Sequence, residues 1–540
     1  MRRLPLLLSS LSAAALLSAA ALPAVAEAPA AVAAPAAAAA VADGHTAFTY
    51  RDLIGLNRLG DPQVSPDGAW VIYSVTATDV EANRRSGSIW IRPVADDGPP
   101  RRLAISDGGA NTARWGSDNH IYFLSSRSGS SQVWRAGADG TGATQVTDLP
   151  VDVNAYRLSR AADKLVMSLA VFPDCADLAC SVERARAEAE RKSTGRVYDR
   201  MFVRHWDTWN DGTQNHLFTQ AIGEDGLASG DPVWVSKGFD GDTPSKPFGD
   251  ESEFTFTPDG DAVVFSAREA GQSEPWSTNF DLWRTNGLSG DGAFENLTEA
   301  NPAWDTGAVF SPDGRTMAYL AMGRPGFEAD KFSIFLKDVA SGQTRQIAAN
   351  WDRSPGGLQW GPDGNTLYAT AGDVGQTRIF AIDTRNGAVV PITGPGHVSS
   401  FGLTPSGIVF ARDALDAPSD LYFKTYRGRE MPRRLTHVNP SLDDKVFGEA
   451  EQFTFTGWND ETVHGYVIKP AGYVEGRQYP VAFLIHGGPQ GSFGNSWSYR
   501  WNPSTYAGAG YAVVMIDFHG STGYGQAFTD SISQHWGDRP

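Results

Sequence analysis

The sequence predicts an all-β seven-bladed β-propeller followed by an incomplete α/β domain. Three observations lead to this fold class. A turn motif recurs seven times between about residues 60 and 438, two strand signals follow each copy, and the pattern changes after Asn439 to continuous apolar runs that end in Gly-rich loops. The chain has 540 residues, of which 41% are hydrophobic, so it can bury a large core.

The first 26 residues predict a secretory signal peptide. Arg2 and Arg3 precede an apolar stretch over residues 4–22, and the small residues 24–26 offer a cleavage site. An uncleaved N-terminal membrane anchor is the alternative. Residues 27–47 are rich in Ala and Pro and are interpreted as a linker. We therefore expect a periplasmic or secreted protein that has no membrane segment once the signal peptide is removed.

A repeated turn predicts the propeller over residues 48–440. Ser65-Pro66-Asp67-Gly68 is the first copy, and further copies begin at residues 116, 159, 257, 311, 361 and 404. Pro presets φ in such a turn, Asp caps it and Gly takes the last position. An aromatic or apolar strand and a strand resembling Arg-x-Leu-Thr follow each copy, so four strands per copy predict seven blades. Two stacked β-sandwiches are the alternative.

The third and fourth turns are about 98 residues apart, against about 43 to 54 elsewhere, which places an insertion at about residues 173–215. Residues 178–192 are rich in Ala, Glu and Arg without Gly or Pro, and predict a short exposed helix. The aromatic and charged residues 196–207 either line a substrate entrance or pack against a blade. Cys175 and Cys180 are predicted to form a structural disulfide, which an exported compartment permits.

Composition excludes several classes of protein. The net charge of −17 argues against a nucleic-acid binder, which needs a basic face to neutralise phosphates. Two cysteines exclude a disulfide-dense scaffold and a Cys-rich zinc or iron–sulfur domain. None of the ten His residues lies in an H-E-x-x-H motif, and we expect neither a metal nor another cofactor.

Residues 441–540 predict the beginning of an α/β sheet. Two antiparallel strands are expected at 453–455 and 463–468, and apolar runs at 479–485 and 511–516 predict strands buried on both faces. A helix is expected over 497–507, between these two runs. A strand, a Gly-rich loop, a helix and a second strand in this order open an α/β-hydrolase sheet.

The loop His486-Gly487-Gly488-Pro489 has a chemical interpretation. Acyl transfer builds negative charge on a carbonyl oxygen, and backbone N–H groups aimed at that oxygen stabilise the transition state. Pro489 has no N–H, so the donor is expected to be Gly488 or Gly487, and we favour Gly488. His486 and Pro489 would then support the loop. A tight turn without a ligand is the alternative.

A second loop, Gly520-Ser521-Thr522-Gly523-Tyr524-Gly525, follows the next strand. With His486-Gly487-Gly488-Pro489-Gln490 and the preceding propeller, it makes residues 48–540 resemble the prolyl oligopeptidase family of serine peptidases. Within that family the chain is most similar to bacterial members of the dipeptidyl-peptidase V and acylaminoacyl-peptidase types. One departure is His519, where many relatives have Arg.

The resemblance implies a propeller seated over an α/β-hydrolase domain, with the active site in the cavity between them. It also implies cleavage of short peptides, and dipeptidyl members release dipeptides from free N-termini. Such specificity requires a carboxylate to hold the α-amine, for which Glu251 and Glu253 are candidates. The sequence leaves the side-chain preference and the oligomeric state open.

The sequence contains no nucleophile elbow. G-x-S-x-G is absent, Ser492 and Ser521 lack the strand–elbow–helix context, and His486 and Asp517 precede the place of a nucleophile. We therefore expect the catalytic Ser, Asp and His to lie beyond Pro540, and the chain as given to be inactive, with a half sheet that exposes an apolar edge. The alternatives are a naturally shortened propeller that binds or scaffolds, and an esterase-type hydrolase.

Overall fold

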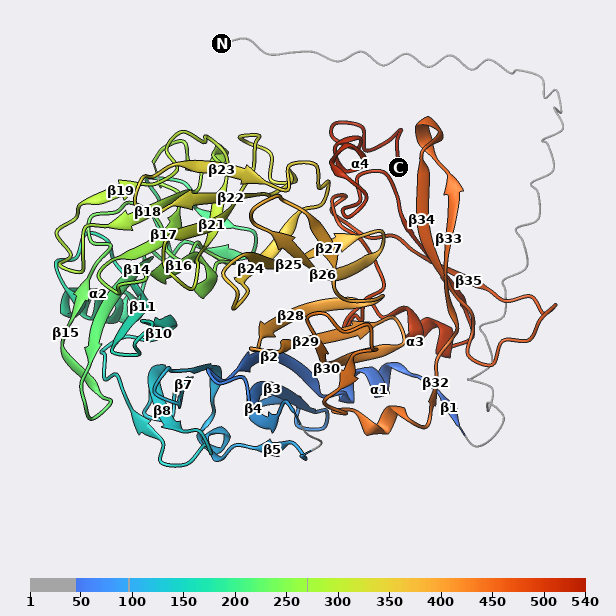
Figure 1. Ribbon diagram of the computed structural model, residues 1–540, viewed down its shortest axis with the longest axis horizontal. Helices are drawn as coiled ribbons and strands as arrows, with labels where there is room; N and C mark the ends of the chain where they lie inside the picture. Colours follow the sequence, from blue (N-terminus) through green and yellow to red (C-terminus); the bar gives the residue numbers. More distant parts are fainter. Residues whose placement is uncertain (1–44, 96–97, 270) are drawn as a thin grey trace, which may run out of the picture.

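The computed structural model describes residues 45–95, 98–269 and 271–540. The predicted signal peptide and most of the predicted linker lie outside the described residues. Figure 1 shows small β-sheets arranged around a ring, with the C-terminal segment forming a further sheet at one side of it. No helix within these ranges is long and apolar enough to cross a membrane.

Consecutive groups of four strands build the ring, and each group is an antiparallel meander. Three of the groups precede residue 240: β2 (Arg58–Val64), β3 (Trp70–Asp79), β4 (Arg84–Pro93), β5 (Arg101–Arg102); β6 (Asn111–Trp115), β7 (His120–Ser125), β8 (Gln132–Gly137), β9 (Thr144–Gln145); β10 (Val153–Leu158), β11 (Lys164–Val171), β14 (Gln214–Ile222), β15 (Ala228–Trp234). Two more separate sheets follow: β16 (Phe254–Phe256), β17 (Val263–Ala267), β18 (Asp281–Thr285), β19 (Phe294–Asn296); β20 (Asp305–Phe310), β21 (Thr316–Ala321), β22 (Ser333–Asp338), β23 (Thr344–Ile347).

The last eight strands of the ring form one sheet, because a single parallel pair, Thr377 with His397, joins two meanders. These strands are β24 (Pro355–Trp360), β25 (Thr366–Asp373), β26 (Gln376–Asp383), β27 (Val389–Pro391), β28 (His397–Leu403), β29 (Gly407–Ala414), β30 (Ala417–Thr425) and β31 (Arg433–Arg434). The expected order of turn, apolar strand and closing strand is present in each meander. Short 3₁₀ helices connect strands: η2 (Ala104–Gly108), η3 (Glu251–Glu253), η4 (Glu274–Trp276), η5 (Pro440–Leu442) and η6 (Trp458–Asp460).

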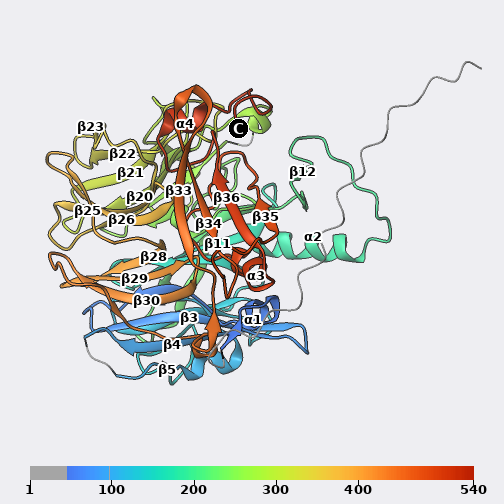
Figure 2. The same ribbon diagram turned by 90° about the vertical axis from the view of Figure 1, so that its right-hand side faces the viewer.

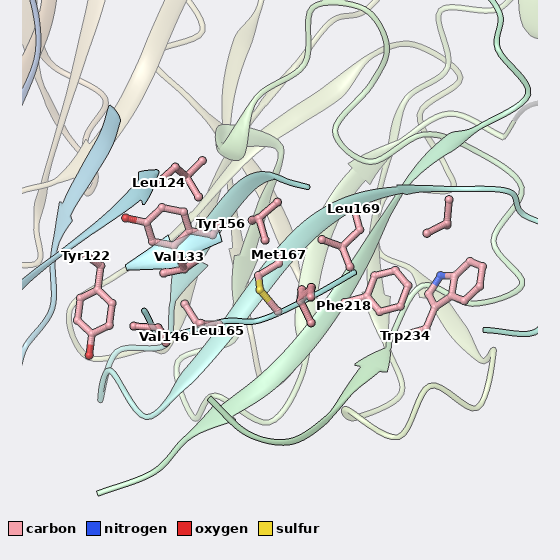
Figure 3. Close-up of a cluster of buried hydrophobic side chains, with 13 residues drawn as sticks. Tyr122, Leu124, Val133, Val146, Tyr156, Leu165, Met167, Leu169, Phe218 and Trp234 are labelled. Atoms are coloured by element: carbon pink, nitrogen blue, oxygen red, sulfur yellow. The ribbon is translucent and has the colours of Figure 1, made fainter. Parts of the chain in front are cut away.

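Side chains pack between neighbouring sheets. Figure 3 shows one such cluster, which contains Tyr122 and Val133 of the second meander together with Met167 and Phe218 of the third. Another cluster joins the first meander to the last, because Val71 packs with Leu421 and their neighbours. Burial of these apolar faces is the main stabilising contribution to such an architecture. The meanders from β2 to β31 therefore form a β-propeller.

The Pro-Asp-Gly turns join the first strand of a meander to the second. In the first copy Gly68 has φ of 74°, and the Asp67 carboxylate accepts hydrogen bonds from Ser65 Oγ at 2.5 Å and the Ala69 N–H at 2.9 Å. Strand direction alternates in a meander, so the connections between the second and third strands lie on the opposite face of the ring. That second face is the one that contacts the C-terminal sheet, as shown below.

The predicted insertion is one of those connections, between β11 and β14. It contains α2 (Leu178–Glu190), which ends two residues before the predicted helix and is capped by Asp177, and the hairpin of β12 (Arg204–His205) and β13 (Thr208–Trp209). Cys175 and Cys180 form a disulfide, which confirms that prediction. In Figure 2 the insertion projects on the side where α3 and β35 lie.

The C-terminal sheet has the order β33-β34-β36-β35. Its strands are β33 (Ala450–Thr456), β34 (Thr462–Ile468), β35 (Val481–Leu484) and β36 (Ala512–Asp517), and only β35 and β36 are parallel. The prediction that 479–485 is buried on both faces is wrong, since Val481, Phe483 and Ile485 are 62%, 51% and 67% exposed. Within the described residues β35 pairs only with β36, so it forms one of the two edges of this sheet (Figure 2).

The helices of this region are α3 (Pro503–Gly508) and α4 (Gln526–Asp530). The predicted helix over 497–507 is too long at its N-terminus. Asn502 caps α3 and Pro503 takes the first helical position, where a missing N–H has no cost. Trp497 instead contacts the ring, where its N–H donates to Asp413 at 2.8 Å.

Residues 46–56 lie with the C-terminal region rather than in the ring. β1 (Thr46–Ala47) pairs with β32 (Lys445–Val446), and α1 (Tyr50–Gly55) begins at a capping box made by Thr49 and Asp52. Phe48 packs against Trp497, so this segment contributes apolar side chains to a buried cluster that it shares with the C-terminal region. The predicted linker therefore ends in a strand, and the ring begins at Arg58 rather than at residue 48.

Candidate active site

A cavity of about 930 Å³ lies between the ring and the C-terminal sheet. The ring side is formed by the insertion, by the β17–β18 and β21–β22 connections and by the segment before β24. The other side consists of Gly488, Gln490, Thr522, Gly523, Gly525, Gln526 and Thr529. Both Gly-rich loops that the sequence singles out therefore contribute to one cavity.

The loop at residues 486–489 follows β35. Gly488 has φ of 126°, and a Cβ atom at this position would lie 2.6 Å from the backbone N of Gln490, so only glycine fits. Gly488 lines the cavity, and among the described residues its N–H donates to no other group. That N–H is consequently available to a bound carbonyl oxygen.

Gly487 and Pro489 differ from Gly488. Neither is among the described residues that line the cavity, and a Cβ atom on Gly487 would meet nothing within 4 Å. Pro489 supports the loop through its carbonyl oxygen, which accepts from the Gly491 N–H at 2.9 Å. The assignment of the oxyanion donor to Gly488, with Gly487 second, remains a prediction.

His486 links the two Gly-rich loops. Its Nδ1 is 2.8 Å from the Gly487 carbonyl oxygen and its Nε2 is 2.9 Å from Ser521 Oγ. A carbonyl oxygen only accepts, so in the neutral ring Nδ1 has the proton and Nε2 accepts from the Ser521 hydroxyl. The ring also stacks on Phe518 with centroids 4.4 Å apart.

Ser521, His486 and Asp517 have the composition of a catalytic triad but not its geometry. The same nitrogen of His486, Nε2, is the one nearest to the Ser521 hydroxyl and to Asp517 Oδ1, which lies 3.7 Å away. In a catalytic triad the histidine contacts the serine through one ring nitrogen and the aspartate through the other. Ser521 is also completely buried, so a substrate carbonyl has no access to its hydroxyl. These residues therefore hold the loops together.

Asp517 is the centre of a buried hydrogen-bond network at the end of β36. Its carboxylate, in a residue only 2% exposed, accepts from Ser492 Oγ at 2.7 Å, the Phe493 N–H at 2.8 Å and the Tyr524 hydroxyl at 2.6 Å. Burial, and then the charge of Asp517, raises the pKa of Tyr524. The Thr522 N–H donates to the Gly491 carbonyl at 2.8 Å, so the loops are also joined directly.

Sequence reasoning missed this role of Asp517 and Ser492. The only available signal was an Asp placed directly after a buried strand.

His519, the departure from the family pattern, lies outside the cavity lining among the described residues. It is buried, stacks on Phe528 at 4.6 Å and approaches Glu461 Oε2 at 3.2 Å.

The ring holds the loops in place through the β25–β26 turn. The Val374 N–H donates to the Gly523 carbonyl at 3.0 Å, and the Asn495 N–H donates to the Gly375 carbonyl at 2.6 Å. Gln376 also donates to the Tyr466 hydroxyl at 2.8 Å. The cavity is therefore formed by two parts of the chain that are in direct contact.

Most charged groups around the cavity are paired. Arg268 with Glu274, Arg324 with Asp330 and Arg353 with Asp373 form ion pairs at 3.3, 2.9 and 2.9 Å, and the Asp352 carboxylate accepts from the Gln526 N–H. Lys331 has no ion pair but donates to the Trp351 carbonyl at 3.1 Å, whereas Glu328, in the same β21–β22 connection, differs from all of these. It is exposed, and within the part of the chain that the structure describes it has no hydrogen-bond or ion-pair partner.

Glu251 and Glu253, the two carboxylates that the sequence analysis names for an α-amine site, bind other groups of the ring instead. Glu251 pairs with Arg114, which also contacts Asp61, and Glu253 accepts from the Ser245 N–H and hydroxyl at 2.7 and 2.8 Å. Neither carboxylate lines the cavity. Over residues 45–95, 98–269 and 271–540, no group of three or more His, Cys, Asp or Glu side chains is arranged to hold a metal ion.

Comparisons with known proteins agree on a family. Residues 497–540 match the model of the prolyl oligopeptidase family. The chain is 30% identical over 531 residues to a probable dipeptidyl-peptidase 5 of Trichophyton verrucosum, covering 92% of this chain and 71% of that protein. It is 29% identical over 529 residues to dipeptidyl-peptidase 5 of Arthroderma otae, covering 92% and 70%.

Solved structures share the fold. The acylaminoacyl peptidase of Pyrococcus horikoshii superposes with a TM-score of 0.67 at 19% identity, covering 89% of this chain and 68% of that one. A puromycin-hydrolyzing peptidase of Mycobacterium tuberculosis superposes with a TM-score of 0.60 at 15% identity, covering 92% and 72%. Together with the sequence matches, this similarity leads to one conclusion: the chain belongs to the prolyl oligopeptidase family of serine peptidases.

Proposed function

We propose that this chain comprises the gating propeller and the oxyanion-loop half of an exported serine peptidase that cleaves short peptides. The observation that carries the proposal is the free N–H of Gly488 in the wall of a cavity that the propeller covers. A backbone donor in a site screened from water stabilises a developing oxyanion far more than it would in bulk water.

The reaction we propose is acyl transfer. A serine attacks the peptide carbonyl, a histidine moves its proton to the leaving amine, and water then hydrolyses the acyl-enzyme. In this chain Gly488, or Gly487 as the second candidate, donates its N–H to the tetrahedral intermediate. His486, Ser521 and the Asp517 network keep that loop in position. No cofactor takes part in this scheme.

We propose that the enzyme releases dipeptides from free N-termini. The two relatives reported above are named probable dipeptidyl-peptidase 5 and dipeptidyl-peptidase 5. A charged α-amine needs a carboxylate partner when it is taken out of water. Glu328 is the unpaired carboxylate of the cavity, so it replaces Glu251 and Glu253 as our candidate for this contact.

We further propose that the ring consists of seven blades and that its loops limit access to short peptides. Its seven four-strand meanders support that number. Export is supported by the signal-like residues 1–26 and by the disulfide between Cys175 and Cys180, a bond that persists in oxidising compartments.

The nucleophile is proposed to lie outside the 540 residues, because the sequence lacks G-x-S-x-G and the match covers only 71% and 70% of the two relatives. The test compares this chain with a longer chain translated past codon 540. Only the longer chain is expected to react with a fluorophosphonate probe and to turn over a dipeptidyl chromogenic substrate. Reaction of the 540-residue chain, or no reaction of either chain, would contradict the proposal, and the second result would favour a binding protein.

A further inference from the structure

Five aromatic side chains gather at the ring side of the cavity. We call Phe202, His205, Trp206, Phe248 and Trp276 the aromatic wall. The His205 ring lies 5.2 Å from the Phe202 ring and 5.8 Å from the Phe248 ring, and the Trp206 ring lies 6.3 Å from that of Phe248, measured between centroids. Phe202, His205 and Trp276 line the same cavity as Gly488.

The aromatic wall is unusually exposed. Trp206, Phe248 and Trp276 are 73%, 70% and 75% accessible to solvent. Folded monomers seldom expose several large aromatic side chains together, and such patches commonly bind another molecule. In this chain the patch extends into a cavity that already contains the proposed oxyanion donor.

The wall is fixed by its surroundings. Residues 204–209 form the β12–β13 hairpin, which holds His205 at the cavity and turns at Trp206. The guanidinium of Arg268 lies 5.7 Å from the Phe202 ring centre, donates to the Ser277 carbonyl at 2.6 Å and pairs with Glu274 at 3.3 Å. Arg268 thereby joins the insertion to the β17–β18 connection that contains Trp276.

Arg204 and Asp207 of the hairpin are exposed charges outside the cavity lining. At the cavity itself, Arg268 and Glu274 neutralise each other beside Phe202 and Trp276. A charged side chain would lose its hydration there without gaining a partner, whereas an aromatic side chain can stack on the exposed rings. The unpaired carboxylate, Glu328, lies in the neighbouring connection.

We propose that the aromatic wall is a subsite that binds an apolar, preferably aromatic, side chain of the peptide substrate. The proposal rests on the proposed function, since it assumes that the cavity binds peptides. Stacking on one or two exposed rings is expected to increase affinity for a phenylalanine peptide about tenfold over a glycine peptide.

The experiment measures peptide binding to the full 540-residue chain by isothermal titration calorimetry. The probes are triglycine and the three tripeptides in which one glycine is replaced by phenylalanine. Trp276→Ala removes a ring that lines the cavity, and Phe248→Ala removes the ring behind His205. Trp209→Ala is the matched control, because Trp209 is 60% exposed on the same insertion but lies outside the cavity lining.

At least one phenylalanine peptide is expected to bind about tenfold more tightly than triglycine. Trp276→Ala and Phe248→Ala should each reduce this preference at least threefold, while Trp209→Ala keeps it and all variants bind triglycine equally. Equal binding of all four peptides, or a preference that survives both wall variants, overturns the subsite. Those results leave the peptidase proposal intact, because that proposal fails only in the fluorophosphonate test on the longer chain.

Discussion

The hydroxyl of Tyr524 donates a hydrogen bond of 2.6 Å to the buried carboxylate of Asp517. Tyr524 belongs to the second Gly-rich loop, and Asp517 also accepts from Ser492 and Phe493 just after the first. One carboxylate at the end of a strand therefore sets the distance between two loops that line the cavity. Three donors satisfy it, which is the condition for keeping a charge in so buried a position.

Replacing Tyr524 by phenylalanine removes one of these donors. Hydrogen bonds to charged groups contribute about 1.5–3 kcal/mol, so Tyr524→Phe is expected to lower the free energy of unfolding by about that amount. Urea unfolding followed by tryptophan fluorescence measures the change. Tyr473→Phe is the control, because among the described residues the Tyr473 hydroxyl has no hydrogen bond, and its stability should stay within about 0.5 kcal/mol. Equal effects of the two substitutions would exclude a stabilising role of this hydroxyl.

Alanine at the two adjacent glycines should have unequal effects. At Gly488 a Cβ would lie 2.6 Å from the Gln490 N, at a φ of 126°, whereas at Gly487 it would meet nothing within 4 Å. Loss of one oxyanion donor costs about 10²–10³ in kcat. Alanine keeps the backbone N–H, but the clash at Gly488 must displace it, so in the longer chain we expect Gly488→Ala to approach that loss and Gly487→Ala to stay within about threefold. Steady-state kinetics on a dipeptidyl substrate provides the measurement, and the reverse order would contradict the assignment of the donor to Gly488.

A buried carboxyl makes stability depend on pH. Burial, and then the charge of Asp281, raises the pKa of Asp305 from 3.8 to about 7, although Asn301 donates to its carboxylate. Between these values the folded chain keeps a proton that the unfolded chain has lost. The contribution of Asp305 to the free energy of unfolding therefore falls as pH rises from about 4 to about 7, by up to about 1.4 kcal/mol per pH unit.

Asp305→Asn is expected to remove this contribution. The urea midpoint of the variant should rise relative to that of the original chain as pH increases from 4.5 to 7.5. Asp416→Asn, at an exposed carboxylate in the β29–β30 connection, is the control and should leave the pH profile unchanged. Parallel profiles for Asp305→Asn and the original chain would show that Asp305 titrates near its ordinary pKa.

Glu328 should distinguish free from blocked N-termini. A tripeptide with a free α-amine is expected to bind this chain about tenfold more tightly than its N-acetylated form, because a charge-assisted contact contributes about 1.5 kcal/mol. Glu328→Gln should abolish this difference and leave affinity for the acetylated peptide unchanged. Glu224→Gln is the control, since Glu224 is exposed in the β14–β15 turn on the other face of the ring. Calorimetry with an unchanged preference in Glu328→Gln would exclude Glu328 as the α-amine partner.

Local signals predicted much of this structure. The Pro-Asp-Gly turns were visible because φ preferences belong to single residues, and the helix at 178–190 and the disulfide depend on contacts within a few positions. Burial of β35 was not predictable, since it depends on which strand lies beside it. The Asp517 network joins residues 25 positions apart, and the cavity brings Phe202 and Trp276 near Gly488. Such proximity is a property of topology rather than of local sequence.

The placement of the insertion has a consequence for engineering. β11 and β14 pair without interruption from Lys164 with Ala221 to Val171 with Gln214, although about 40 residues intervene at that end. The ladder is unchanged because the insertion begins where β11 ends and finishes where β14 begins, so it adds no residue within either strand. The insertion lies on the face of the ring that borders the cavity. Segments exchanged between β11 and β14 are thus expected to replace Phe202 and His205 in the cavity lining while the ladder keeps its register.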